Sequence, residues 1–128
     1  MDIHIYYEDT DCGGVVYYAN YLKYFERART HHLEDHGISV ASLQQQGTWF
    51  VVTHAEVHYR SPARYGETLQ IQTTVSSTRK VSLTFHHRIT ERHSARLVAE
   101  GSATLVAVND LGKVVRLNPQ MLQELVTM

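Results

Sequence analysis

Cysteine, proline and an excess of either charge are all scarce in this chain. It contains one cysteine and two prolines in 128 residues, so no internal disulfide can form. Twelve Lys and Arg against 13 Asp and Glu leave a formal net charge of -1 at pH 7. A domain that binds nucleic acid usually carries a basic excess, so nucleic acid is not an expected partner.

Long apolar runs, repeats and low-complexity segments are also missing from the sequence. Every apolar run is broken well before the roughly 18 residues that a membrane-spanning helix needs, so no membrane span is expected. The acidic N-terminus lacks the basic and apolar regions of a signal peptide. With 43% hydrophobic residues, the chain is predicted to form one globular domain over residues 1–128. Its single cysteine favours a location in the cytoplasm.

Most of the chain alternates between apolar and polar residues, which is the pattern of half-buried strands. A short strand is predicted at the N-terminus and longer ones follow from residue 49 onward. Their predicted ranges are 2–7, 49–60, 69–76, 81–89 and 97–108, with a further short strand over 114–117.

The period changes to three or four residues between the first and second strands. A long amphipathic helix is predicted to start at Val15 or Val16 and to end at Gly37. Its apolar stripe consists of Tyr18, Tyr21, Leu22, Phe25 and Ala28. Short helices are predicted after Ser39 and from Pro119 to about Thr127. This order predicts an α+β fold in which an antiparallel sheet wraps around the long helix.

A carboxylate-rich loop, residues 8–14 (EDTDCGG), precedes the predicted long helix. The unpaired N–H groups of a helix start can stabilise negative charge on an oxygen, and the two glycines allow a ligand to approach the backbone closely. A carboxylate there could act as nucleophile or general base. The alternative interpretation is that Asp9 or Asp11 only caps the helix.

The nine histidines raise the question of a metal site. His32 and His36 lie four residues apart on the predicted helix, but the sequence contains no His-Glu-x-x-His motif. A calcium loop that starts at Asp9 would end on Asn20 instead of the required glutamate. No metal is therefore predicted. The strand histidines are interpreted as groups on the sheet surface: His54, His58, His86 and His87.

Several blocks of sequence resemble the signature of hotdog-fold acyl-CoA thioesterases of the 4-hydroxybenzoyl-CoA thioesterase type. Within that type, the chain is most similar to the group associated with the Tol–Pal system. The blocks in the first third of the chain are YEDTD at 7–11, GVVY at 14–17, NY at 20–21 and FERAR at 25–29. The resemblance continues through YRSPA at 59–63 and GE at 66–67 to RK at 79–80.

The resemblance implies a hotdog fold, in which a curved antiparallel sheet surrounds a central helix, and an activity that hydrolyses acyl-CoA without metal or cofactor. It implies that Asp11 attacks the thioester carbonyl or activates water, and that the backbone amide of Tyr18 polarises the carbonyl oxygen. Gly14, Val15 and Asn20 are then expected to contact the substrate.

The same resemblance implies that the basic turn at Arg79 and Lys80 contacts the nucleotide end of coenzyme A. It also implies a homodimer or homotetramer whose site lies between two subunits.

Two residues depart from the pattern of the Tol–Pal-associated group. Tyr18 stands where that group typically carries histidine, although the 4-hydroxybenzoyl-CoA type has tyrosine there. Cys12 stands where relatives often have alanine or proline, and the sequence shows no basic partner that would activate its thiol. The alternatives to a thioesterase are a dehydratase that acts on hydroxyacyl thioesters and a binding module that has kept the fold without activity.

Overall fold

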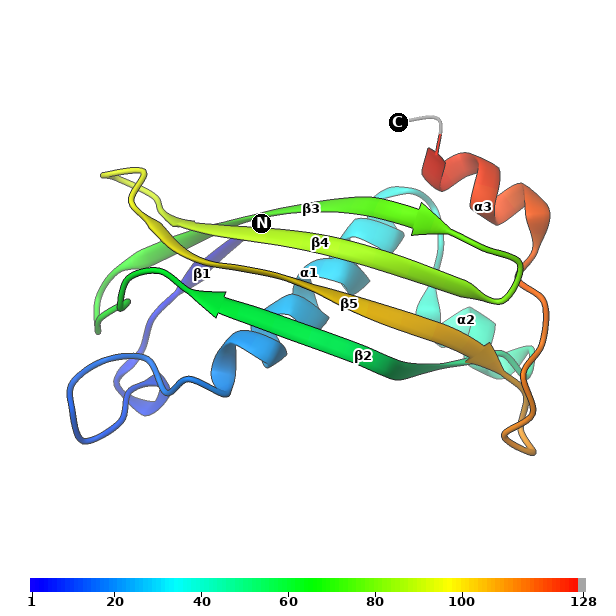
Figure 1. Ribbon diagram of the computed structural model, residues 1–128, viewed down its shortest axis with the longest axis horizontal. Helices are drawn as coiled ribbons and strands as arrows, with labels where there is room; N and C mark the ends of the chain where they lie inside the picture. The colour runs from blue at the N-terminus through cyan, green and yellow to red at the C-terminus, as the bar shows by residue number, and fades with distance from the viewer. Residues whose placement is uncertain (127–128) are drawn as a thin grey trace.

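A computed structural model describes residues 1–126 of the chain (Figure 1). One long helix is followed by four long strands, as the alternation of the sequence predicts. In chain order the elements are β1 (Asp2–His4), a 3-10 turn η1 (Tyr7–Asp9), α1 (Asn20–Asp35), α2 (Val40–Gln45), β2 (Trp49–Tyr59), β3 (Thr68–Thr78), β4 (Ser82–Glu91), β5 (Leu97–Val108) and α3 (Pro119–Val126).

The five strands form one antiparallel sheet in the order β1-β3-β4-β5-β2. The sheet curves around α1, which crosses its concave face, while α3 packs near the end of β3 (Figure 1). The predicted α+β architecture with a wrapped central helix is therefore confirmed. None of the helices in residues 1–126 has the length and apolar character needed to cross a membrane.

The core lies between α1 and the concave face of the sheet, in two clusters of buried side chains. The first surrounds the N-terminal half of α1 and includes Tyr21, Phe25 and Ala28. The second surrounds its C-terminal end and includes Leu33, together with residues of α3. Leu22, which was expected on the apolar stripe, is 44% exposed. The buried stripe is thus rotated from the predicted one and is formed by Tyr21, Tyr24, Phe25, Ala28 and Leu33.

The long helix begins later than the periodicity predicts. Val15 and Val16 are extended, and each forms a single β-bridge, to Arg64 and to Thr10. The helix starts only at Asn20, because the backbone just before it is already bonded to other parts of the chain. Its C-terminal end agrees with the prediction, since Gly37 follows the last turn with a φ of 77° and its N–H donates to the carbonyl of Glu34.

Two of the predicted strands are shorter in the structure. The first ends at His4, and Tyr7 enters the η1 turn. The segment expected as a strand over 114–117 forms only one bridge, between Val108 and Val114. The predicted end of the last helix at Thr127 lies outside the described residues, whereas its start at Pro119 is confirmed.

His87 corrects the interpretation of the strand histidines as surface groups. It points into the core from β4 with no exposed area, and its ring stacks on Phe25 at a centroid distance of 4.6 Å. Its Nδ1 lies 3.0 Å from the hydroxyl of Thr73. It occupies the same face as Phe85 and Ile89, so the strand period placed it inside, although its polarity suggested the surface.

Gly101 of β5 gives a test of this packing. A Cβ at this position would lie 2.1 Å from the carbonyl oxygen of Glu56 and 2.8 Å from the ring of Phe25. Gly101→Ala is expected to lower the free energy of unfolding by about 3 kcal/mol, the upper range for an overpacked core, because one of the contacts is backbone. Urea unfolding measures the change, with Ser102→Ala on the opposite face of β5 as control. A Gly101 variant as stable as the control would contradict this packing.

Candidate active site

The carboxylate-rich loop is ordered by its own hydrogen bonds. Asp9 accepts a hydrogen bond from the backbone N–H of Tyr6 at 2.8 Å through Oδ2. The carbonyl of Asp9 accepts from the backbone of Tyr17 at 2.9 Å and from the side-chain amide of Asn20 at 2.9 Å. These bonds tie Asp9, near the start of the loop, to Tyr17 and Asn20, which follow the loop in the sequence. The expectation that Asn20 contacts substrate stays a prediction, since its side-chain NH2 already has this partner.

Asp11 lies at the tip of the loop and is exposed. Its backbone N–H donates to the carbonyl of Val15 at 2.9 Å, and its carbonyl accepts from Gly14 at 3.0 Å. Its Oδ1 accepts from the backbone of Gly13 at 2.8 Å, and its Oδ2 has no hydrogen bond to any of residues 1–126. Gly14 has a φ of 79°, a conformation that favours glycine. The turn thus holds one carboxylate oxygen and leaves the other available.

Neither acidic residue caps the long helix. Ala19 is the N-cap residue of α1, and no side chain forms a capping hydrogen bond there. The interpretation of Asp9 or Asp11 as a helix cap is therefore wrong. Asp11 is instead close enough to Tyr17 for its charge to contribute to a raised pKa of that phenol, which arises mainly from a side-chain hydrogen bond with Tyr18.

Tyr18 lies two residues before α1, not within its first turn as expected. Its backbone N–H has no acceptor among residues 1–126. Its carbonyl accepts a hydrogen bond from the hydroxyl of Tyr59 at 3.0 Å. In the sequence, the only signal for Tyr59 is its place in the YRSPA block. An unpaired amide held by a neighbouring side chain is a suitable donor for a carbonyl oxygen.

A cavity of about 310 Å³ is lined in part by Tyr18. Two of its lining residues, Val15 and Val16, belong to the loop that follows Asp11. The others are Tyr18, Tyr21, Tyr59, Arg60, Ser61 and Pro62. The rings of Tyr18 and Tyr21 approach that of Tyr59 at centroid distances of 6.4 and 5.6 Å. Burial raises the pKa of Tyr21. The cavity therefore has an aromatic wall formed by Tyr18, Tyr21 and Tyr59.

Arg79 and Lys80 are exposed in the turn between β3 and β4. This turn and the loop before α1, which carries Asp11, lie at opposite ends of the sheet (Figure 1). The Asp11 loop contacts the start of β3, through the bridge between Val15 and Arg64. The 11 residues of β3 separate the two regions, and the ten steps between the first and the last of them span roughly 33 Å at about 3.3 Å per residue. Within one chain, the structure does not bring the basic turn and Asp11 together.

The predicted His32 and His36 pair lies at the far end of α1. The centroids of the two imidazole rings are 4.3 Å apart, and Nδ1 of His36 lies 2.6 Å from the carbonyl oxygen of His32. Within residues 1–126, no group of three His, Cys, Asp or Glu side chains is arranged to hold a metal ion.

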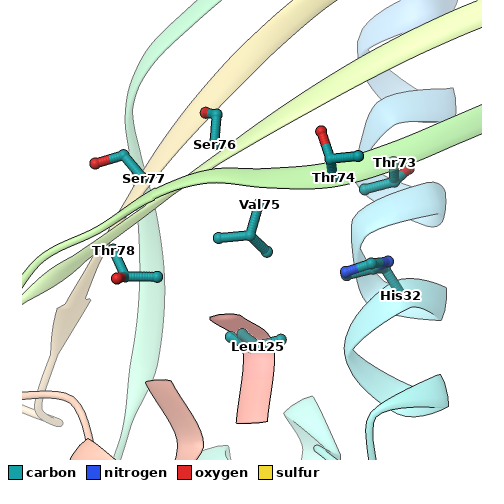
Figure 2. Close-up of a pocket in the computed structure, with 8 residues that line it drawn as sticks. All are labelled: His32, Thr73, Thr74, Val75, Ser76, Ser77, Thr78 and Leu125. Atoms are coloured by element: carbon teal, nitrogen blue, oxygen red, sulfur yellow. The ribbon is translucent and has the colours of Figure 1, made fainter. Parts of the chain in front are cut away.

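A second cavity, of about 440 Å³, separates His32 of α1 from β3 and α3 (Figure 2). Val75 and Leu125 point toward each other across it, and hydroxyl residues of β3 complete its lining (Figure 2). Among the described residues, His32 is the one ionisable residue of its lining, and burial lowers the pKa of that imidazole. Within residues 1–126, this cavity therefore offers fewer reactive groups than the Asp11 loop.

The sequence matches the thioesterase-like superfamily over residues 6–125, so the chain belongs to this family. Among its relatives, the acyl-CoA thioester hydrolase YbgC of Escherichia coli O6:H1 is 42% identical over 85% of this chain and 81% of its own length. The acyl-CoA thioesterase YbgC of Haemophilus influenzae is 36% identical over 88% of this chain and 81% of its own length.

Solved structures agree with this assignment. The crystal structure of a DHNA-CoA thioesterase from Staphylococcus aureus superposes with a TM-score of 0.92 and is 28% identical, covering 97% of this chain and 85% of that one. The resemblance to hotdog thioesterases, drawn from short sequence blocks, is therefore confirmed in both sequence and fold.

Proposed function

We propose that this chain is an acyl-CoA thioesterase that hydrolyses acyl-CoA to a free acid and coenzyme A. The proposal rests on an available carboxylate oxygen on Asp11 and on a Tyr18 amide without an acceptor among residues 1–126, in a segment whose Val15, Val16 and Tyr18 line an aromatic cavity. The names of the YbgC relatives supply the same reaction and the same substrate class.

In the proposed reaction, the Tyr18 amide donates a hydrogen bond to the thioester carbonyl oxygen, where negative charge develops. Asp11 acts in one of two ways. As general base it removes a proton from water while the water oxygen bonds to the carbonyl carbon, and the proton passes to the sulfur as the C–S bond breaks. As nucleophile it forms an acyl anhydride and releases the thiolate, and water then hydrolyses the anhydride.

The residues that follow Asp11 are proposed to contact the reacting part of the substrate. Gly14 and Val15 bring the backbone to the edge of the cavity, and Asn20 holds the loop against α1. Arg79 and Lys80 are proposed to contact the phosphates of coenzyme A. Because they lie far from Asp11 in the same chain, this proposal requires that the basic turn comes from a second subunit.

The edge strand β2 supports such a subunit arrangement. β2 lies at one end of the strand order, and four of its apolar side chains are exposed: Trp49, Val51, Val52 and Tyr59 are 41%, 47%, 47% and 51% exposed. A long, exposed edge strand readily pairs with another strand. Antiparallel pairing of two β2 strands reverses the direction of the second chain, so its β3–β4 turn moves toward the Asp11 loop of the first.

The protein is therefore expected to be a homodimer or a homotetramer in solution. Sedimentation equilibrium should give at least twice the 14.7 kDa of one chain. A monomer mass at the concentration of an activity assay would overturn the shared site. The cytoplasmic location stays a prediction.

Release of free coenzyme A from a panel of acyl-CoAs tests the function itself. The panel should run from short to long aliphatic and to aromatic acyl groups. Turnover that depends on Asp11 would support the thioesterase, and the expected size of that dependence is given in the Discussion. Tight acyl-CoA binding without turnover would favour the binding module instead.

A further inference from the structure

The connection between β2 and β3, residues 60–67, forms one wall of the candidate site. It is held by backbone hydrogen bonds to Ile5, Val16 and Val98 and by the side chain of Arg96. Ser61 and Pro62 line the cavity beside Tyr18. This connection is also bonded to the Asp11 loop, since the backbone N–H of Val16 donates to the carbonyl of Ala63 at 2.8 Å. What holds residues 60–67 in place therefore also affects where Asp11 lies.

Arg96, just before β5, makes most of the side-chain contacts to this connection. Its Nε donates to the hydroxyl of Ser61 at 3.1 Å, and its Nη2 donates to the carbonyl of Pro62 at 3.0 Å. The same Nη2 reaches both carboxylate oxygens of Glu67, at 3.1 and 3.0 Å. One guanidinium thus contacts three separate residues of the connection.

Glu67 extends this set of contacts. Its Oε1 also accepts a hydrogen bond from the backbone N–H of Arg64 at 2.6 Å. The Arg96 and Glu67 side chains are 39% and 23% exposed, so the pair is better shielded from water than an ordinary surface ion pair. The hydroxyl of Ser61 in turn donates to the carbonyl of Leu97 at 2.6 Å. The pair therefore fastens the connection to the start of β5.

Hydrogen bonds lead from this pair to the candidate catalytic carboxylate. Arg96 holds Pro62, and the next residue, Ala63, accepts from Val16. The residue before Val16 is Val15, whose carbonyl accepts from the backbone of Asp11 at 2.9 Å. No step in this path depends on a flexible surface side chain other than Arg96 itself.

We propose that Arg96, with Glu67 as its counterion, is a positioning residue for the Asp11 loop. The inference rests on the proposed thioesterase function. Arginine suits this role because its planar guanidinium offers several donors in a fixed geometry, whereas the single ammonium group of lysine cannot reach three acceptors in the same way. A displacement of about 1 Å in a catalytic group can lower the rate by roughly a hundredfold.

The test compares Arg96→Lys, which keeps the charge, with Arg92→Lys as a matched control. Arg92 lies in the same β4–β5 turn and pairs with Asp2 at 3.0 Å, but it has no contact with residues 60–67. We expect Arg96→Lys to lower kcat roughly tenfold to a hundredfold with little change in KM, because positioning affects the reacting carboxylate more than substrate binding. Arg92→Lys is expected to keep both constants.

A second measurement does not require activity. Hydrogen exchange of the Val16 amide reports on its bond to Ala63, and this exchange is expected to be faster in Arg96→Lys than in the wild type or in Arg92→Lys. Glu67→Gln, which keeps an oxygen for the Arg64 N–H but loses the charge, is expected to show an intermediate effect.

The outcomes separate this inference from the proposed function. A folded wild type that hydrolyses no acyl-CoA would overturn the thioesterase, while Val16 exchange would still decide whether Arg96 holds the loop. Hydrolysis by the wild type with an unchanged kcat in Arg96→Lys would overturn the positioning role alone. Unchanged Val16 exchange in Arg96→Lys would overturn it as well.

Discussion

Replacing Asp11 by asparagine is expected to lower kcat for acyl-CoA hydrolysis at least about a hundredfold and to leave the fold intact. A positioned general base alone contributes roughly a hundredfold to ten-thousandfold, and an amide can act neither as base nor as nucleophile. The fold should persist because Asp11 is exposed, and the asparagine oxygen can still accept the hydrogen bond from Gly13. Coenzyme A release at saturating substrate measures the loss.

Cys12→Ser is the matched control for this experiment. Cys12 is the neighbouring residue, is exposed, and has a free thiol that would itself react with a thiol reagent. Its replacement should keep kcat and also remove that background. If Asp11→Asn kept the turnover of Cys12→Ser, catalysis by Asp11 would be refuted, and another group would have to activate the water.

The second large effect is a loss of stability in acid that comes from His87. Burial, together with the smaller electrostatic effects of Arg29, His86 and His32, lowers the pKa of this imidazole from 6.5 to about 3. The unfolded chain therefore binds a proton at His87 below about pH 6.5, whereas the folded chain does not until about pH 3. Stability is fully present above pH 6.5 and falls as the pH is lowered through this window.

Between pH 7 and pH 5, this one group is expected to lower the free energy of unfolding by about 2 kcal/mol. This range lies above the titration of most carboxylates, so the change comes from imidazoles, and His32, whose pKa burial also lowers, adds to that of His87. Urea unfolding at both pH values measures the change in the wild type and in His87→Phe, where most of it should disappear. Thr73→Val removes only the hydroxyl partner of His87 and should retain the dependence. A His87→Phe variant as acid-sensitive as the wild type would contradict the buried neutral state.

The start of α1 is a feature that sequence periodicity alone does not predict. Val15 and Val16 fit the start of an apolar stripe, yet they are extended. Their backbone is bonded to the β2–β3 connection, which lies far away in the sequence, and those bonds outweigh a local preference for helix. The same long-range bonds place the Tyr18 amide before α1, where it has no acceptor within the described part of the chain, and no local pattern predicts this.

The amino-acid sequence by itself determined the four long strands, the C-terminal end of the long helix, the short helices after Ser39 and at Pro119, and the loop that carries Asp11. Each of these depends on local chemistry: a period of two for strands, the freedom of glycine at positive φ, and a run of carboxylates before two glycines. Only the tertiary structure decided that His87 is buried, that Arg79 lies far from Asp11, and that Arg96 holds the wall of the cavity. These facts depend on contacts between residues that are distant in the chain, and burial and hydrogen bonding there are set by the packing of the sheet around α1.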